Sequence, residues 1–166
     1  MSFKANFQYE HSWGVIYGWF SLRGLQRLEL PSMDREASRW SVLHSAANDG
    51  RVRALHTALE RYFAGVRETF EEIPLDIDGA SPFHQEVWRA ARSVGWGVTS
   101  TYGDLALRLG KSKSAARAVG RALGANPLAM VVPCHRFLGA DGSLHGFAAG
   151  LSWKRELLRI EGVLLH

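Results

Sequence analysis

Cysteine is almost absent from this chain, since Cys134 is the only one among 166 residues. One cysteine cannot form an internal disulfide, and no cluster of Cys and His has the spacing of a zinc finger. A disulfide framework and a cysteine-based metal site are therefore excluded. The one thiol lies in the segment VVPCHRF, between a proline and a His-Arg pair, and this position needs an explanation.

Long hydrophobic runs are lacking as well. No apolar segment approaches the ~20 residues of a membrane span, and the most hydrophobic early segment, residues 13–20, is short and has no basic leader before it. We therefore expect a cytoplasmic protein with no membrane partner. Hydrophobic residues at 46% and charged residues at 22% are typical of an ordinary globular chain.

A strong net charge is also lacking, because the formal value is only +4. The charges are nevertheless unevenly distributed. Residues 1–80 hold nine Lys and Arg against eleven Asp and Glu, whereas residues 81–166 hold eleven against five. A basic second half indicates a polyanionic partner for that half, although net charge alone is a weak signal.

The first half has the pattern of a small α+β unit. Segments 6–20 and 25–31 are rich in aromatic and aliphatic residues, which predicts strands. Residues 32–49 are polar and predict irregular structure, while apolar residues recur at helical spacing over residues 50–64. Residues 71–79 predict a strand followed by a turn.

The second half changes character, so we expect an N-terminal domain over residues 1–79 and a mainly helical domain over residues 80–166. Capping residues and apolar spacing predict four helices, over residues 81–95, 101–110, 114–127 and 152–160. The second and third of these are joined by a tight turn in a basic region, which indicates a helix-turn-helix. Asp141 and Gly142 predict a hairpin turn.

The surroundings of Cys134 leave two interpretations open. A lone cysteine is commonly an inert buried thiol. However, Pro133 ends strand pairing, and His135 and Arg136 are costly to bury, so we expect the chain to leave the core here. Nearby basic side chains also favour the thiolate, which is the nucleophilic form. Local context therefore fits an inert core thiol and a nucleophile about equally well.

A nucleophilic Cys134 needs a base. Adjacent side chains on an extended strand point to opposite faces, so His135 could take the thiol proton only through a bridging water. Glu161 could orient the imidazole, but by its sequence position alone it is a solvated residue at a helix end.

The helix predicted over residues 114–127 is very slim. Arg117 and Arg121 project from one side of it, four residues apart. Such a helix could pack closely against another helix, or it could lie deep in a nucleic-acid groove with an arginine reaching into the base stack. Its small residues are Ala115, Ala116, Ala118, Gly120, Ala122, Gly124 and Ala125.

Seven segments carry a resemblance to a known family, in the order TYGDLA, AARAVG, NP, VVPCHRF, GFAAG, KRELL and EG. In these segments the chain closely resembles the O6-alkylguanine-DNA alkyltransferases, also called methylated-DNA–protein-cysteine methyltransferases. The resemblance covers about residues 82–162. It implies a small ribonuclease-H-like α/β domain followed by a mainly helical domain with a winged-helix-like helix-turn-helix. It also implies a monomer that needs no metal and no other cofactor.

The resemblance further implies direct-reversal DNA repair. The alkyl group of O6-alkylguanine, and also of O4-alkylthymine, would pass from duplex DNA to Cys134 once and irreversibly, after the nucleotide is flipped out of the stack. His135 resembles the water-bridged base, Glu161 the carboxylate that orients it, and Tyr102 the proton donor to the departing guanine. Asn126 resembles the asparagine that holds the backbone of the active-site turn.

The family pattern assigns DNA contacts to the slim helix and its surroundings. Arg117 matches the finger that enters the minor groove, which is only ~6 Å wide, and fills the space of the flipped nucleotide. The other expected DNA contacts are Ala115, Ala116, Ala118, Gly120, Arg121 and Arg136. The expected substrate pocket comprises Pro133, Phe147, Ala148, Ala149 and Gly150.

The chain departs from the family pattern at four places. Phe147 replaces a tyrosine of the binding loop, Ala149 replaces a frequent glycine, and Gly95 replaces a frequent proline. The turn between the two short helices is one residue longer and lacks a common proline. These changes bear on the pocket and on the aim of Arg117, and they leave Cys134 in place.

Two other functions fit part of the sequence. A lesion-binding or helix-turn-helix DNA-binding protein would use the same helices, with Cys134 as a structural residue. A cysteine hydrolase would use Cys134, His135 and Glu161, but adjacent Cys and His are poorly placed for the direct contact that hydrolases use.

Overall fold

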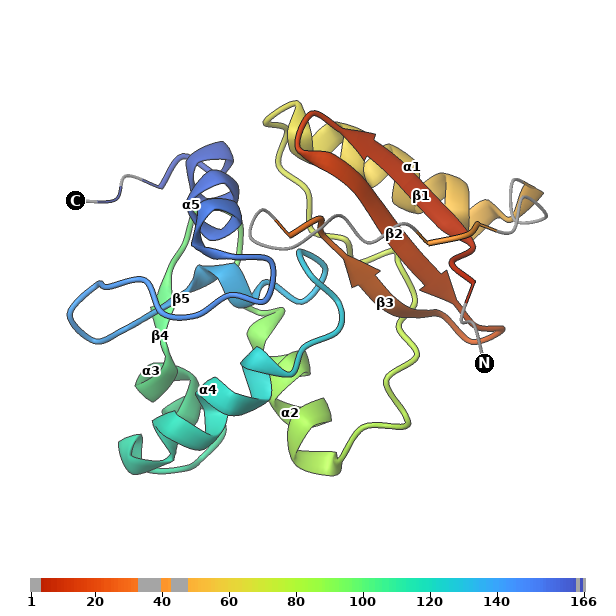
Figure 1. Cartoon of the computed structure of the whole chain (residues 1–166). Coiled ribbons are helices and arrows are strands. Elements are labelled where there is room, and N and C mark those ends of the chain that lie inside the picture. The colour runs from red at the N-terminus through yellow and green to blue at the C-terminus, as the bar shows by residue number, and fades with distance from the viewer. Residues whose placement is uncertain (1–3, 33–39, 43–47, 164, 166) are drawn as a thin grey trace.

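The computed structural model describes residues 4–32, 40–42, 48–163 and 165, so most of the segment 32–49 lies outside the described residues. The fold is α+β. Its first part is an antiparallel sheet of order β1-β2-β3 and one helix, and Figure 1 shows that helix behind the sheet. These elements are β1 (Phe7–His11), β2 (Gly14–Phe20), β3 (Leu25–Glu29) and α1 (Gly50–Phe63).

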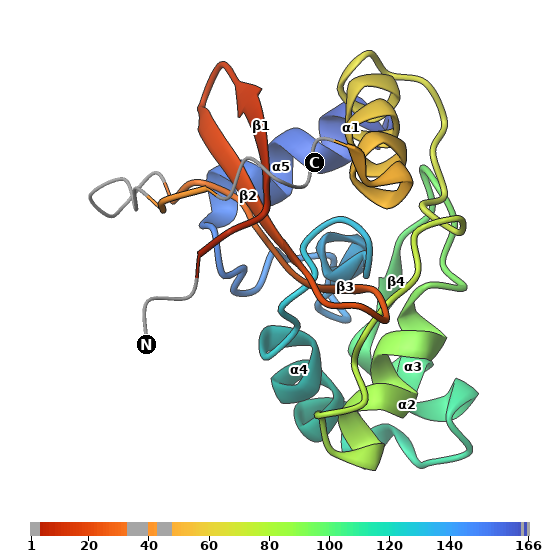
Figure 2. The same ribbon diagram turned by 90° about the vertical axis from the view of Figure 1, so that its right-hand side faces the viewer.

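The second part is mainly helical, and its three short helices gather at the lower end of the molecule in Figures 1 and 2. A two-residue parallel pair, β4 with β5, lies between these helices and α5. The elements are α2 (Pro82–Ala91), β4 (Ser100–Thr101), α3 (Tyr102–Arg108), η2 (Lys113–Ala115), α4 (Ala116–Gly124), η3 (Cys134–Arg136), β5 (Phe137–Leu138) and α5 (Leu151–Ile160). No helix among the described residues is long and apolar enough to cross a membrane.

Local signals account for the helix starts. The Ser81 side chain accepts a hydrogen bond from the backbone of His84, and Pro82 takes the first helical position. Thr101 accepts from the backbone of Asp104 at 3.0 Å in the same way. These caps satisfy amide groups that a helix leaves unpaired at its first turn. The predicted starts of α2 and α3 are therefore confirmed.

Three predicted segments fold differently. The stretch 6–20 is two strands that fold back on each other, with Gly14 at a φ of +126° after the turn. Residues 71–79 form no strand and make only an isolated bridge between Leu75 and Leu25. The predicted helix over 114–127 begins as the single 3₁₀ turn η2 and becomes α-helical only at Ala116.

The apolar run before Cys134 is not a strand either. Met130 has a φ of +68°, and the run bends into a series of turns that end in the 3₁₀ turn η3. A side chain pairs part of its backbone: Asn126 accepts from Leu128 N at 2.8 Å and donates to Val132 O at 3.0 Å. An isolated bridge, between Leu128 and Leu28, joins the run to β3. Cys134 therefore lies on a tight turn, and not at the end of an extended strand.

The two parts share one hydrophobic core. Buried side chains of the sheet and α1, such as Leu25 and Leu55, belong to the same cluster as Val87 and Trp153 of the second part. Backbone contacts reinforce this, since Leu28 of β3 donates to Pro127 O at 2.9 Å. The sheet thus supports the segment that leads to Cys134.

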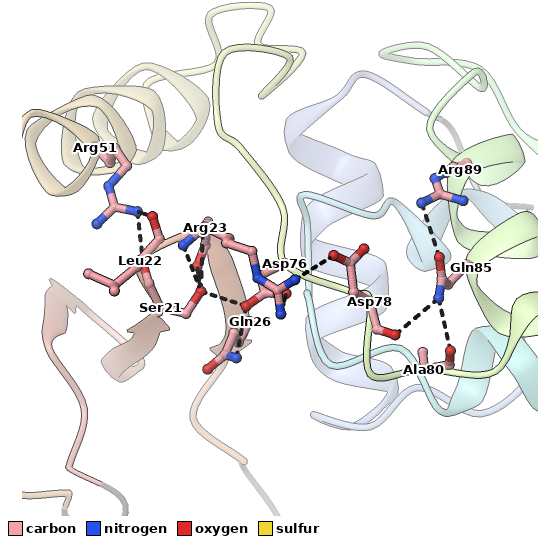
Figure 3. A network of polar contacts seen from close by, with 11 residues as sticks. Ser21, Leu22, Arg23, Gln26, Arg51, Asp76, Asp78, Ala80, Gln85 and Arg89 are labelled. Atoms are coloured by element: carbon pink, nitrogen blue, oxygen red, sulfur yellow. Dashed lines mark hydrogen bonds and ion pairs between the residues drawn. The ribbon is translucent and has the colours of Figure 1, made fainter.

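A polar network joins the turn after β2 to the segment that enters the second part (Figure 3). Asp76 is at its centre: the Ser21 hydroxyl donates to its carboxylate at 2.5 Å and the Gln26 amide at 3.0 Å. Arg23 lies 3.7 Å from Asp76 and donates to Asp78 at 3.0 Å. The hydrogen bond from Ser21, aided by the charge of Arg23, lowers the pKa of Asp76.

We expect Asp76→Ala to lower the free energy of unfolding by roughly 1–3 kcal/mol, because the part-buried hydrogen bonds from Ser21 and Gln26 lose their charged acceptor. The matched control is Asp78→Ala, whose carboxylate is 59% exposed, and it should change stability by less than about 0.5 kcal/mol. Since the pKa of Asp76 is lowered, its stabilisation is present above the ordinary value of 3.8 and is lost as the pH falls below it. Urea unfolding of both variants at several pH values measures this, and equal losses would contradict it.

Candidate active site

The thiol of Cys134 is held by the turn on which it lies. Its backbone N–H donates to Val132 O at 2.8 Å, and the Asn126 amide lies 3.4 Å from the sulfur. Asn126 therefore contacts the thiol and also pairs the backbone of the turn that presents it. The side chain of Cys134 is half-buried and borders an open pocket.

His135 and Arg136 converge on the carboxylate of Glu161. His135 Nε2 lies 2.6 Å from Oε1, while Arg136 donates from Nε to Oε2 at 2.9 Å and from its terminal nitrogen to Oε1 at 3.0 Å. All three side chains are buried. Burial alone would raise the pKa of Glu161, but the hydrogen bonds from His135 and Arg136, together with the charge of Arg136, lower it to about 2. Glu161 is therefore ionised at neutral pH.

The hydrogen bond to Glu161 determines which ring nitrogen of His135 carries the proton. An ionised carboxylate only accepts hydrogen bonds, so Nε2 carries the hydrogen and Nδ1 keeps its lone pair. Nδ1 is buried and has no hydrogen-bond partner among the described residues. Burial lowers the pKa of His135, although Glu161 opposes this effect. The imidazole is therefore neutral at neutral pH, with a free basic nitrogen.

The pKa of the Cys134 thiol is raised, although the basic residues next to it in sequence predicted that the thiolate would be favoured. Burial raises the pKa of Cys134, and hydrogen bonding from Asn126 and the charge of Lys154 oppose this only in part. Arg136 cannot favour the thiolate as predicted, because its guanidinium is directed to Glu161. The resting form is the neutral thiol, and a base must remove its proton before it can attack an electrophile.

Lys154, on α5, is a site residue that the sequence analysis missed. Its side chain is fully buried, and Nζ donates to the carbonyl of His145 at 3.1 Å. Burial lowers its pKa to about 8, while interaction with Cys134 opposes that shift. A mostly protonated lysine near the thiol favours the thiolate that forms on reaction. The sequence pattern that could have identified Lys154 is its helical spacing, which places it on the same face of α5 as Leu157, Leu158 and Glu161.

Replacing Lys154 by methionine should raise the pKa of the Cys134 thiol further. We expect reaction with iodoacetamide at pH 7 to slow roughly threefold to tenfold, since one pKa unit changes the thiolate fraction about tenfold. The difference should shrink above pH 8, where Lys154 loses its charge. Arg155→Met is the matched control, because Arg155 is the next residue and is exposed. Equal rates for both variants at pH 7 would show that Lys154 does not act on the thiol.

A pocket of about 860 Å³ opens at Cys134. Tyr102, Phe147, Ala148 and Ala149 line it, and the far wall is formed by the sheet of the first part. Burial and the neighbouring Cys134 raise the pKa of Tyr102, so its hydroxyl keeps its proton. Phe147 and Ala149, two of the departures from the family pattern, therefore lie at the pocket wall.

The surface of α4 is basic and open. Arg117, Ala118 and Arg121 are exposed, while Ala115 and Ala116 are half-buried. Gly120 lies against the ring of Tyr102, where an added Cβ would come within 3.6 Å of the ring. Gly120 also lines the pocket, so this helix connects an exposed basic face to the pocket of Cys134.

Three predicted site residues lie neither at the pocket wall nor on the exposed basic surface. Arg136 is only 5% exposed and is held by Glu161 and the carbonyl of Val94, so it has no free surface for a phosphate. Pro133 is buried before the turn, and Gly150 precedes α5 with a φ of +99°; neither lines the pocket. The expectation that the chain leaves the core at His135 and Arg136 was wrong, because Glu161 satisfies both residues inside it.

Tyr62, from α1, is a second residue that the sequence analysis missed. Its hydroxyl donates to Oε1 of Glu161 at 2.7 Å, across 99 residues of sequence. Its helical spacing with Leu55 and Leu59 is compatible with a core position but gives no sign of a polar partner. Among the described residues, no group of three or more His, Cys, Asp and Glu side chains is placed to hold a metal ion.

The geometry can be compared with known proteins. A family model described as the DNA-binding domain of 6-O-methylguanine DNA methyltransferase matches residues 82–163. A methylated-DNA–protein-cysteine methyltransferase of Haemophilus influenzae is 50% identical over 106 residues, 64% of this chain and 58% of that protein. One of Shigella flexneri is 45% identical over 121 residues, 73% of this chain and 68% of that protein. The matched segment thus spans less than two thirds of the first of these relatives.

A solved structure resembles both parts of the fold. Mycobacterium tuberculosis OGT in complex with DNA is 34% identical to this chain, with a TM-score of 0.74, and the match covers 94% of this chain and 92% of that one. These findings confirm the resemblance inferred from the segments around VVPCHRF, and the chain belongs to the methylated-DNA–protein-cysteine methyltransferase family.

Proposed function

We propose that this chain repairs alkylated DNA by direct reversal, with Cys134 as a single-use alkyl acceptor. One observation carries the proposal: the thiol borders a pocket lined by Tyr102, and the neighbouring His135 and Glu161 form a buried pair with a free basic nitrogen. The substrate is O6-alkylguanine in duplex DNA, and O4-alkylthymine is a second expected substrate. Relatives named for this activity support the assignment.

The reaction is an in-line displacement. The thiol proton passes through a water to Nδ1 of His135, and the resulting imidazolium is stabilised by Glu161. The sulfur attacks the alkyl carbon, the bond from that carbon to O6 breaks, and its electron pair passes to the guanine. Tyr102 supplies a proton to the departing base. The thioether has no easy route back, so each molecule acts once.

The buried site explains how a neutral thiol is converted to the reactive thiolate only during the reaction. The pKa of Cys134 is raised, so little thiolate is present without substrate. Proton transfer to His135 places the positive charge next to Glu161, whose low pKa keeps it ionised. The thiolate therefore forms beside the positive charge of Lys154, while Glu161 stabilises the imidazolium that forms together with it.

We further propose that DNA is bound by α3 and α4 acting as a helix-turn-helix, with residues 80–166 as the DNA-binding and acceptor domain. Arg117 fills the space of the flipped nucleotide, and Arg121 contacts phosphate, because both are exposed on the basic face of α4. The related Mycobacterium tuberculosis structure, solved with DNA, supports a DNA partner. The sheet and α1 form a supporting ribonuclease-H-like domain, and the protein acts in the cytoplasm as a monomer.

The test incubates the protein with duplex DNA that carries O6-methylguanine with a labelled methyl group. The expected result is transfer of one equivalent of label to Cys134, found by peptide mass spectrometry, and no transfer by Cys134→Ala. Binding of the lesion without transfer would overturn the proposal in favour of a lesion-binding protein. Release of more than one equivalent of product would indicate a hydrolase.

A further inference from the structure

The first part of the chain reaches into the site through one side chain. Tyr62, in the last turn of α1, is fully buried, and its hydroxyl lies 2.7 Å from Oε1 of Glu161. The hydroxyl oxygen of Tyr62 also lies 3.4 Å from Leu157 O and 3.5 Å from Nε2 of His135. These contacts place α1 against α5, at the point where the general base is held.

Five hydrogen bonds from the described residues converge on the Glu161 carboxylate: one from His135, two from Arg136, one from the backbone of Gly97 and one from Tyr62. Tyr62 and His135 share the same oxygen, Oε1. Among the described donors, only Tyr62 belongs to the first 79 residues, and the others belong to the second part of the chain.

The hydroxyl of Tyr62 has little freedom to turn elsewhere. Its ring meets Trp96, Phe63 and Phe70 at centroid distances of 5.0, 5.6 and 5.9 Å. Burial first, and then the charge of Glu161, raise its pKa well above the ordinary value. The hydroxyl is therefore a permanent donor, held in one place by three aromatic rings.

We propose that Tyr62 is a positioning residue for alkyl transfer: its hydroxyl fixes the carboxylate of Glu161, and through Glu161 it sets the orientation and basicity of His135. This inference rests on the proposed function. It assigns to the first part of the chain a direct contribution to the chemistry, beyond support of the fold. A carboxylate held from two sides keeps the imidazole in the orientation that the water-bridged proton transfer needs.

The direction of the effect follows from the shared oxygen. A donor on Oε1 reduces the negative charge that this oxygen presents to His135, so the imidazolium is stabilised less. Removing the hydroxyl should therefore raise the pKa of His135 from its lowered value. The titratable and charged groups that face this pair are Tyr62 from α1, Arg136 from η3, Cys134, and Lys154 and Glu156 from α5.

The test is Tyr62→Phe, which removes one oxygen and keeps the ring. We expect the single-turnover rate of methyl transfer to fall about tenfold, because a residue that orients a general base contributes less than the base itself. The acid limb of the pH-rate profile should move to higher pH, and the ¹⁵N shifts of His135 should show the same change in pKa. DNA affinity should not change.

The matched control is Tyr9→Phe. Tyr9 stacks on Phe63 at 5.8 Å, in the same part of the chain, and it is not a donor to Glu161. This variant should keep the wild-type rate and the wild-type pH profile. If Tyr62→Phe lowers the melting temperature but leaves the rate and the His135 pKa unchanged, Tyr62 has only a structural role and the inference is wrong.

A double-mutant cycle further distinguishes a positioning role of Tyr62 from a merely structural one. If Tyr62 acts through Glu161, Tyr62→Phe should slow the Glu161→Gln variant by less than about twofold. A full tenfold loss in that background would contradict the inference. Failure of the proposed function is distinguishable, because it would be seen in the wild-type protein as lack of transfer to Cys134.

Discussion

Replacement of Glu161 by glutamine should slow alkyl transfer by about 100-fold or more and lower the free energy of unfolding by roughly 3–5 kcal/mol. The reason is that five hydrogen bonds converge on this buried carboxylate. A neutral amide leaves the charge of Arg136 uncompensated in the interior, and it also removes the partner that stabilises protonated His135. Single-turnover kinetics and urea unfolding measure the two losses.

The pH dependence of this stability difference has a definite sign. The pKa of Glu161 is lowered from 4.5 to about 2, so its stabilisation is complete above pH 4.5 and is lost as the pH falls toward 2. The difference in unfolding free energy between the wild type and Glu161→Gln should therefore shrink over this range. A difference that stayed constant down to pH 2 would contradict the assigned ionisation.

A neighbouring carboxylate on the same helix provides the control. Glu156 pairs with Arg159 at 2.7 Å, and the side chain of Arg159 is 71% exposed. Surface pairs of this kind contribute little, so Glu156→Gln should change the unfolding free energy by less than about 1 kcal/mol. It should also leave the transfer rate near the wild-type value. A loss as large as that of Glu161→Gln would show that helix α5 is generally intolerant of charge removal.

The second large effect concerns Arg117. We expect Arg117→Ala to slow repair of O6-methylguanine in duplex DNA by roughly 100-fold, since flipping a base costs a few kcal/mol that the arginine helps to offset. Reaction with a free alkylated guanine base should change by less than about twofold, because a free base needs no flipping. Arg117 is exposed on α4, so its loss should not disturb the core.

Comparison with Arg121→Ala sharpens this result. Arg121 lies one turn further along α4 and is also exposed. If it contacts phosphate, its loss should weaken binding of all duplexes and reduce the salt dependence of binding by about one charge. Rate measurements on both substrates, with binding at several salt concentrations, separate the two roles. Equal losses on duplex and free base would reject the role of Arg117 in flipping.

Many features of the fold were predictable because they depend on neighbours in sequence. The caps at Ser81 and Thr101 lie three residues from the amides that they bind, and apolar spacing marked α1 and α5. Such interactions need no knowledge of the rest of the fold. The segments 71–79 and 128–133 were predicted less well, because both are irregular and are paired by long-range or side-chain contacts.

The sequence by itself determined the family and singled out the candidate acceptor: a single cysteine in VVPCHRF, with ordered segments before and after it. Only the tertiary structure decided the chemistry of that residue. His135 and Arg136 are costly to bury by themselves, and they are buried because Glu161, more than 20 residues away, satisfies both. The raised pKa of Cys134, the buried Lys154 and the hydroxyl of Tyr62 likewise depend on distant packing, since burial and charge pairing are properties of the folded interior.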